Sequence, residues 1–450
     1  MTKYLLLLGV FISSFYFGSC SDPVNTPVPD QAPNTYLTLF PDSTIAPGST
    51  SKRISWWGDS PQGFVVGYRI SFDGINWGFT TKQDSTFFLS IAGSDSTFKF
   101  YVAAVDNLGL IDPTPASNLY PVVNTPPTIA FNYTYSVPDT VFPIVTLLWS
   151  ANDVDGVATI KNIYYSINDT NNYRPLPGNL SQMTLTADSG LVLNGNNKVY
   201  IKAKDNAGAF SNTSVIPDSG KTFYVKKNTA RVLFISDIPG SDLANAQAYY
   251  ANAMDTVKYD VLDIKSYGGA LTPKVINPMF IETLKLFKVV IWSGGTGNAG
   301  NVANFNLAQS SLPFYKLAGG KILFTSGFVT QAQAPNGLVN DFVPIDSVSS
   351  CAIGIVFAGT FNSTIPGYPP LTSTAAVTGV RNLYFSNPMV PLYSYFSTQG
   401  CAGDNRFFVK DAAVNPKVIY CSIPLYQLNG NAANTKTLFR NILFTEFGLN

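Results

Sequence analysis

Two hydrophobic patterns of different period divide the chain into halves. Between residues 36 and 226, apolar and polar side chains alternate in short runs such as Val66–Phe72 and Ile160–Ile167. An alternation of period two is typical of β-strands with one buried face. Each of these runs ends in a turn-forming pair, Asp73-Gly74 in the first case and Asn168-Asp169 in the second. This half is therefore predicted to consist of antiparallel strands joined by hairpins.

The first half is also an internal repeat. Residues 101–109 read YVAAVDNLG, and residues 200–208 repeat the pattern as YIKAKDNAG. Upstream, Trp56 or Trp57 in the first copy corresponds to Trp149 in the second. One large ring can fill the space between two packed sheets. Copies of about 95 residues, built from short strands, predict two all-β sandwiches.

The two copies resemble fibronectin type III domains, of the divergent kind found in secreted bacterial multidomain proteins. The resemblance implies two immunoglobulin-like sandwiches, over residues 36–124 and 125–227. The stiff sequence NTPP at 124–127 is expected to join them. The sequence contains no Arg-Gly-Asp tripeptide, so the best-known adhesion motif of that family does not apply here.

After Lys227 the alternation gives way to unbroken apolar runs. Such runs lie at 231–236, 288–293, 321–326 and 416–422. Continuous apolar strands separated by helical segments are typical of a parallel sheet that is covered on both faces. We therefore expect residues 228–450 to form a flavodoxin-like α/β domain with a doubly wound parallel sheet. An irregular insertion is expected at about 331–411.

Three of these segments resemble the class I glutamine amidotransferase-like superfamily. They read VLFI at 232–235, VVIWSGG at 289–295 and LAGGKILFTSG at 317–327. In active members of the superfamily, a cysteine at a strand–helix turn pairs with a histidine and an acid. Here the turn at 326–328 reads SGF, and the chain contains no histidine. The resemblance therefore implies the fold without the Cys-His chemistry.

The N-terminal residues are typical of an export signal. Lys3 precedes an apolar run that ends in Gly-Ser-Cys, which resembles the lipobox of bacterial lipoproteins. We expect a lipoprotein signal peptide at 1–19, a lipidated Cys20 and a proline-rich tether at 20–35. The lipid would then attach the protein to the membrane. We expect an outer-membrane lipoprotein of the cell envelope that faces the periplasm or the cell surface. Ordinary secretory cleavage is the alternative.

Composition narrows the chemistry further. Charged residues make up 12% of the chain, with 28 Lys+Arg against 27 Asp+Glu. Binding to nucleic acid requires a basic face, so we expect no nucleic-acid partner. Histidine is the most frequent general acid–base and the commonest metal ligand, and this chain has none. We therefore expect a protein that is not an enzyme and needs no cofactor, apart from a calcium site considered below.

Polar residues follow the predicted parallel strands, at the edge where such sheets bind ligands. The residues expected to line this crevice are Ser236, Asp237, Ser293, Gly294, Gly295, Thr296, Ser326 and Gly327. If the glycine-rich turn at 294–297 opens a helix, its backbone N–H groups could bind an anion. The alternative is that these glycines serve only the turn.

Asp153 and Asp155, which precede a glycine turn, suggest a calcium site. Calcium prefers oxygen ligands from loops of this kind, and Asp59 lies at the matching place in the first repeat. The further ligands of an EF-hand loop are missing from the sequence, so a solvated turn is the alternative.

The cysteines after position 20 predict one disulfide and one free thiol. Cys351 and Cys401 both lie in the expected insertion, where a disulfide would limit loop entropy. Cys421 lies in an apolar strand, where a free cysteine behaves as a small buried hydrophobe. We expect Cys351 to pair with Cys401 and Cys421 to remain free.

These observations favour a non-catalytic, lipid-anchored envelope protein. The sandwiches would act as a spacer, and the α/β domain would bind a glycan, a peptide or another envelope protein. One alternative is an extracytoplasmic hydrolase that uses Asp237 or Asp341 as its base. A second alternative is a purely structural envelope component.

Overall fold

The computed structural model describes most of the chain from residue 29 to the C-terminus. The described residues are 29–38, 51–89, 95–133, 137–218, 220–264, 278–296, 302–327, 341–351, 353–386, 389–398 and 401–450. They form two compact units. One unit holds the chain up to Pro126 together with the loops 153–159 and 206–209, and the other holds the remainder.

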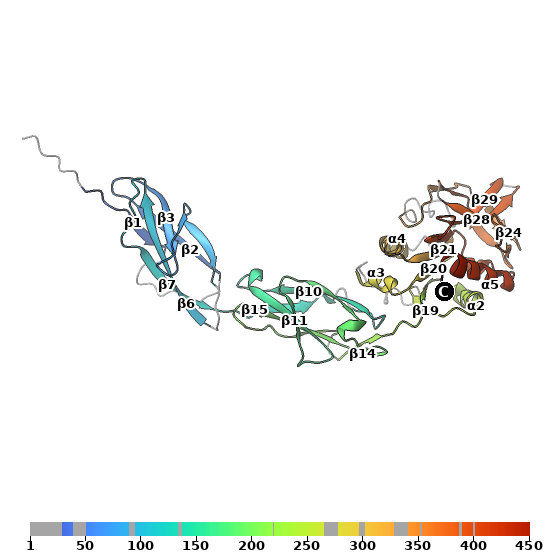
Figure 1. The fold of residues 1–450 in the computed structure, drawn as a ribbon, viewed down its shortest axis with the longest axis horizontal. Coiled ribbons are helices and arrows are strands. Elements are labelled where there is room, and N and C mark those ends of the chain that lie inside the picture. The colour runs from blue at the N-terminus through green and yellow to red at the C-terminus, as the bar shows by residue number, and fades with distance from the viewer. Residues whose placement is uncertain are drawn as a thin grey trace, which may run out of the picture. The chain divides into compact units, whose positions relative to one another are not determined.

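The first repeat is an antiparallel β-sandwich (Figure 1). Its strands are β1 (Asn34–Leu37), β2 (Ser51–Asp59), β3 (Val65–Ser71), β4 (Gly78–Thr80), β5 (Asp84–Phe88), β6 (Asp95–Asp106) and β7 (Ala116–Val123). One sheet has the order β1-β2-β5 and the other β4-β3-β6-β7. Trp56 is the central ring of the core, whereas Trp57, which faces the opposite side of β2, is 43% exposed.

The second repeat is also a β-sandwich, with a third small sheet in which β17 and β9 pair in parallel. Its elements are β8 (Thr128–Phe131), β9 (Thr140–Val141), β10 (Ile144–Asn152), η2 (Val157–Thr159), β11 (Ile160–Ile167), β12 (Arg174–Pro177), β13 (Gln182–Thr186), η3 (Ala187–Ser189), β14 (Gly195–Asn197), β15 (Val199–Asp205), β16 (Ser214–Ile216) and β17 (Phe223–Val225). The sheets have the orders β13-β10-β8, β12-β11-β15-β16 and β14-β17-β9. Trp149 is buried, and its ring N–H donates to the Leu180 carbonyl at 2.8 Å. The predicted pair of immunoglobulin-like sandwiches is therefore present.

The residues after 227 are built around one nine-stranded sheet. The elements up to the insertion are β18 (Val232–Asp237), α2 (Gly240–Ala253), β19 (Tyr259–Asp263), α3 (Pro278–Lys285), β20 (Val289–Thr296), α4 (Val302–Leu317) and β21 (Lys321–Gly327). Those that follow are β22 (Ser347–Val348), β23 (Ile353–Val356), β24 (Thr360–Ser363), β25 (Leu371–Thr372), β26 (Val377–Val380), β27 (Leu383–Tyr384), β28 (Val390–Ser397), β29 (Gly403–Lys410), β30 (Val418–Cys421), η6 (Leu425–Gln427), α5 (Ala432–Arg440) and the π-helix η7 (Asn441–Glu446).

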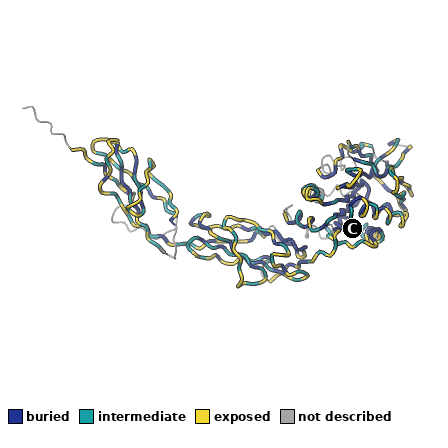
Figure 2. The backbone as a smooth tube through the Cα atoms, in the orientation of Figure 1, coloured by how far each residue is buried: buried dark blue, intermediate teal, exposed yellow. Residues whose placement is uncertain are grey.

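The strand order of this sheet is β19-β18-β20-β21-β30-β29-β28-β24-β25. The first five strands are parallel, and the remaining pairs are antiparallel. On one face, residues such as Phe234 pack with α2 and α5, and on the other face, residues such as Trp292 pack with α3 and α4. Most of the buried backbone of this region follows the sheet (Figure 2).

Two expectations for this region are corrected. A sheet that is parallel throughout is wrong, because four of the nine strands join it antiparallel. The insertion expected at about 331–411 is not irregular where the structure describes it, since it supplies β28 and β29, which extend the central sheet through β30. Whether a strand joins the edge of a sheet depends on the strand with which it pairs. That partner lies elsewhere in the sequence, so the local pattern does not reveal it.

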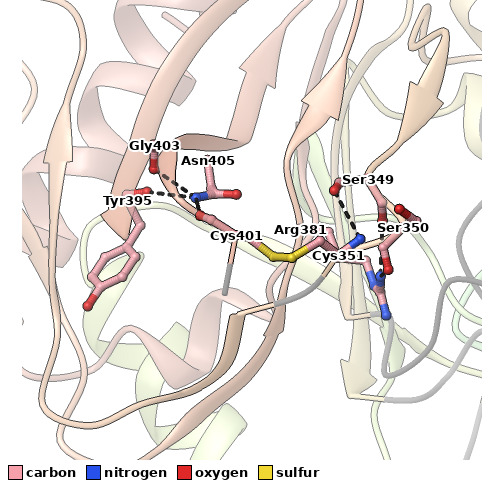
Figure 3. Close-up of a disulfide and its surroundings, with 8 residues drawn as sticks. All are labelled: Ser349, Ser350, Cys351, Arg381, Tyr395, Cys401, Gly403 and Asn405. Carbon is pink, nitrogen blue, oxygen red and sulfur yellow. Dashed lines mark hydrogen bonds between the residues drawn. A yellow bond between two sulfur atoms is a disulfide. The ribbon is translucent and has the colours of Figure 1, made fainter. Parts of the chain in front are cut away.

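A disulfide ties this strand-rich insertion together. Cys351 and Cys401 are bonded, with their Cα atoms 5.7 Å apart, as was expected from the sequence (Figure 3). Beside it, the Asn405 amide donates to the carbonyls of Cys401 and Gly403 at 3.0 and 2.9 Å. On the other side, the Arg381 guanidinium donates to the carbonyls of Ser349 and Ser350, each at 3.0 Å. The bridge therefore joins two segments whose backbone carbonyls each accept hydrogen bonds from a buried side chain.

Candidate functional site

The carboxyl ends of β18, β20 and β21 bring the predicted crevice residues to one edge of the sheet. Ser236 pairs in register with Ser293, and Asp237 pairs with Gly294. Successive residues of a strand point to opposite faces. The predicted set is therefore divided between the two faces of the sheet and does not line a single crevice.

On the face covered by α2 and α5, most polar groups are already hydrogen-bonded. The hydroxyls of Ser293 and Tyr250 lie 2.8 Å apart, and burial raises the pKa of Tyr250, which keeps the phenol neutral. Thr325 donates to the Ile423 carbonyl at 2.7 Å. Ser236 is 3% exposed, and its hydroxyl has no hydrogen-bond partner within the described chain. This face is a packed polar layer in which the Ser236 hydroxyl is unused.

The rim of that face is closed by close packing. A Cβ at Gly295 would lie 2.3 Å from Cδ of Pro239, so only glycine fits there. The Tyr426 hydroxyl donates to the Asp242 carboxylate at 2.7 Å. Gly295 therefore allows the end of β20 to pack against Pro239. This agrees with the alternative that the glycines serve only the turn.

On the face covered by α3 and α4, residues near the carboxyl ends of three neighbouring strands lie side by side. Asp237 is the last residue of β18, and Gly294 and Ser326 lie two residues and one residue before the ends of the neighbouring strands β20 and β21. Gly294 has no side chain, and a Cβ placed there would lie 2.9 Å from Oγ of Ser326. The Asn304 amide of α4 donates to Asp237 at 2.5 Å. We call these four residues the strand-end notch.

The notch combines three kinds of hydrogen-bonding group. Asp237 offers a carboxylate, Asn304 an amide and Ser326 a hydroxyl that has no partner within the described residues. Asp237 is 3% exposed and Ser326 is 1% exposed. Beneath them on the same face lie the rings of Trp292 and Phe324, with centroids 5.8 Å apart. Such an arrangement can bind hydroxyl or amide groups of a ligand over an apolar floor.

The other predicted crevice residues lie at the margin of the notch. Thr296 pairs with Gly327 after a register shift that begins at Ser293. Gly297, the last glycine of the predicted anion-binding turn, lies outside the described residues. Asn304 was not predicted, because the helical spacing of α4 does not indicate which of its polar residues turns toward a strand end.

The structure assigns the two predicted calcium ligands to backbone hydrogen bonds. Asp153 accepts the Asp155 backbone N–H at 2.8 Å, and Asp155 accepts the Thr125 N–H at 2.8 Å. Both side chains are buried, so the alternative of a solvated turn is wrong. Among the described residues, no group of three or more cysteines and carboxylates could hold a metal ion. Calcium binding at this loop stays a prediction.

Two further sites expected from the sequence can be placed. Cys421 is buried and free. The Gln309 amide of α4 donates to Asp341 at 2.5 Å. Gln309 lies five residues after Asn304, which donates to Asp237. Cys20 lies outside the described residues. Within the described part of the chain, no helix is long and apolar enough to cross a membrane.

Comparisons with known proteins add fold likeness only. No protein-family model and no curated protein matches this chain. It is similar to the fibronectin(III)-like modules of CbhA from Clostridium thermocellum, at 14% identity and a TM-score of 0.19, over 43% of this chain and 95% of that one. It is also similar to a tetra-tandem repeat of a large adhesion protein, at 15% identity and a TM-score of 0.24, over 43% and 49%. Domains of titin match at 16% identity and a TM-score of 0.17, over 44% and 67%.

Proposed function

We propose that this chain is a non-catalytic, lipid-anchored protein of the cell envelope. The two sandwiches act as a spacer, and the domain after residue 227 binds a glycan, a peptide or another envelope protein. We further propose that this domain is a divergent flavodoxin-like member of the glutamine amidotransferase-like superfamily. Its five parallel strands in the order β19-β18-β20-β21-β30, with helices on both faces, support that assignment.

The observation that carries the binding function is the buried, unused hydroxyl of Ser326 in the strand-end notch. A buried polar group without a partner costs about 1–3 kcal/mol, so it calls for a specific explanation. A ligand hydroxyl or amide that reached these strand ends would meet the Ser326 hydroxyl on β21 and the Asp237 carboxylate on β18. A bound ligand would supply the hydrogen-bond partner that the Ser326 hydroxyl lacks.

A catalytic role is less well supported by the same geometry. Asp237 and Ser326 belong to strands separated by β20, so their backbones are about 10 Å apart. General-base catalysis needs the two groups within about 2.6–3.2 Å or one bridging water. The chain also has no histidine to relay the proton. This geometry supports ligand binding over activation of Ser326 as a nucleophile by Asp237.

A glycan and peptide array probed with the full chain tests the proposal. We expect at least one class of ligand to bind, and Gly294→Val, whose Cβ would lie 2.9 Å from Oγ of Ser326 and so displace that hydroxyl, to weaken binding at least about tenfold. Asp237→Asn preserves the shape of the side chain and should weaken binding without lowering the melting temperature. Ser236→Ala is the matched control, because it removes an unused buried hydroxyl from β18, on the face opposite Asp237.

Two outcomes would contradict this proposal. One is binding that survives both Gly294→Val and Asp237→Asn in folded protein. The other is conversion of a bound ligand to a new product, followed by mass spectrometry, that is lost in Asp237→Asn. The second result would favour the hydrolase alternative.

The lipid anchor is tested separately. Expression in a bacterium fed an alkyne-labelled fatty acid should label the wild-type chain and leave Cys20→Ser unlabelled. Equal labelling of the two chains would exclude Cys20 as the lipidated residue.

A further inference from the structure

We propose that a polar pocket in the second sandwich binds one carboxylate-bearing sugar unit of an acidic glycan, with the Arg174 guanidinium recognising the carboxylate. This site lies in a domain to which the proposed function gives only a spacer role. The two proposals are independent, because no residue of the strand-end notch lines this pocket.

The pocket lies where the β11–β12 hairpin meets η3. It has a volume of about 330 Å³, at the lower end of the range of small-molecule sites. Its lining is mostly polar and includes Tyr165, Asp169, Asn172, Tyr173, Arg174 and Ser189. A site of this size accommodates one sugar ring and not an extended chain. Polar groups together with aromatic rings suit the hydroxyls and the apolar faces of such a ring.

The hairpin that forms one wall is held in shape before any ligand binds. Asp169 accepts the Asn171 backbone N–H at 2.8 Å and also the Asn172 amide. Asn168 adopts a left-handed φ of 59°, and its side-chain oxygen accepts the Lys198 backbone N–H at 2.7 Å. A wall that is already ordered loses little conformational entropy on binding.

Arg174 crosses from the hairpin toward η3. It pairs with Tyr165 across β11 and β12, so the two side chains lie on the same face. One guanidinium nitrogen donates to the Ser189 carbonyl at 2.7 Å, which fixes the direction of the side chain. Among the described residues, Arg174 makes no ion pair. An oriented guanidinium without a carboxylate partner is suited to bind a ligand carboxylate through two parallel hydrogen bonds.

Asp169 is the other charged residue of the pocket lining. Lys202 lies outside the lining, because it pairs with Tyr164, on the face of β11 opposite Tyr165 and Arg174. The Asn171 N–H and the Asn172 amide hold the pKa of Asp169 below its usual value. Asp169 therefore stays ionised with its oxygens engaged by those two groups, and the guanidinium of Arg174 is the cation of the lining that can recognise a carboxylate.

Isothermal titration calorimetry on the full chain tests this site. The probes are a galacturonic acid trisaccharide, a hyaluronan tetrasaccharide and sialyllactose, each with a neutral counterpart whose carboxylate is reduced to an alcohol. We expect at least one acidic probe to bind at least about tenfold more tightly than its counterpart. Arg174→Gln should lose at least that factor. Arg174→Lys, which keeps the charge without the fork, should fall between the two.

Lys161→Gln is the matched control, because it removes one positive charge from an exposed position of β11 outside the pocket lining. Its affinity should stay within about twofold of wild type. The proposal is overturned if none of the three acidic probes binds more tightly than its neutral counterpart. It is also overturned if folded Arg174→Gln binds as wild type does. Melting curves of each variant establish that it is folded.

Discussion

Asp73 and Asp169 occupy corresponding hairpin turns of the two sandwiches, and hydrogen bonds fix the ionisation of both. Asp73 accepts the backbone N–H groups of Asn76 and Ile75 at 2.7 and 2.8 Å. Asp169 accepts the Asn171 N–H at 2.8 Å. These bonds favour the carboxylate form and hold the pKa of each residue below its usual value. The repeated turn is therefore stabilised by a charged side chain in each copy.

This arrangement predicts a loss of stability in acid. A lowered folded pKa stabilises the protein fully above the unfolded pKa of about 3.9, and that stabilisation disappears as the pH falls through the folded pKa. The melting temperature should therefore fall below about pH 4. An Asp73→Ala/Asp169→Ala chain should melt lower at pH 6 and fall less between pH 6 and pH 3. Parallel curves for the two proteins would show that these turns contribute nothing to the acid sensitivity.

Cys421 provides a second prediction for a single side chain. Burial raises the pKa of its thiol well above the usual value, so the reactive thiolate is scarce at pH 8. In native protein, iodoacetamide at pH 8 should leave the Cys421 peptide unlabelled by mass spectrometry. The same peptide should be labelled in denaturant without reductant. Labelling in the native state would contradict the buried position of Cys421 in β30.

At the scale of elements, the antiparallel extension of the sheet is tied to the C-terminal helices by a buried ion pair. The Lys410 ammonium at the end of β29 lies 2.6 Å from the Glu446 carboxylate of η7, and the two side chains are 5% and 9% exposed. The Tyr368 hydroxyl donates to the same carboxylate at 2.9 Å. This cluster joins three segments that are far apart in the sequence.

Removing one partner of this pair should be costly. Lys410→Met leaves a buried carboxylate without its cation, and we expect a loss of about 3–5 kcal/mol in the free energy of unfolding. The double variant Lys410→Met/Glu446→Gln should recover part of that loss. Lys436→Met is the control, since it breaks an exposed pair with Asp255 and should cost less than about 1 kcal/mol. Equal losses in the two single variants, measured by urea unfolding, would contradict this account.

The same elements show what the sequence can predict and what it cannot. β18, β20 and β21 could be predicted as strands because both of their faces are buried, which produces unbroken apolar runs. β28 and β29 could not be assigned to the sheet, because their pairing depends on the distant strand β30. Pro391 in β28 is a further signal against a strand when only the local pattern is read.

The candidate site was predictable to a similar degree. The residues at the strand ends follow from the ends of the apolar runs, and Asp237, Gly294 and Ser326 were among them. Their separation from Ser236 and Ser293 depends on the pleat and on which helix covers each face. The role of Asn304 depends on the placement of α4, and the pocket around Arg174 depends on the contact of a hairpin with η3. These are tertiary relations, which no local pattern contains.

At the scale of the whole molecule, binding is expected to rely on shaped, hydrogen-bonding sites and not on long-range charge. The net charge is +1 and only 12% of residues are charged. A nearly neutral protein steers charged partners weakly, so its affinity at the strand-end notch should change little with salt. Binding at Arg174 should weaken as salt rises, which separates the two sites experimentally.

The central claim is that the strand-end notch of the domain after residue 227 is a binding site. Hydrogen–deuterium exchange of the full chain, with and without the tightest ligand from the glycan and peptide array, tests this claim most directly. We predict slower exchange of backbone amides at 236–238, 293–296 and 325–327 when the ligand is bound. Slower exchange confined to the two sandwiches, with these three segments unchanged, would contradict the claim.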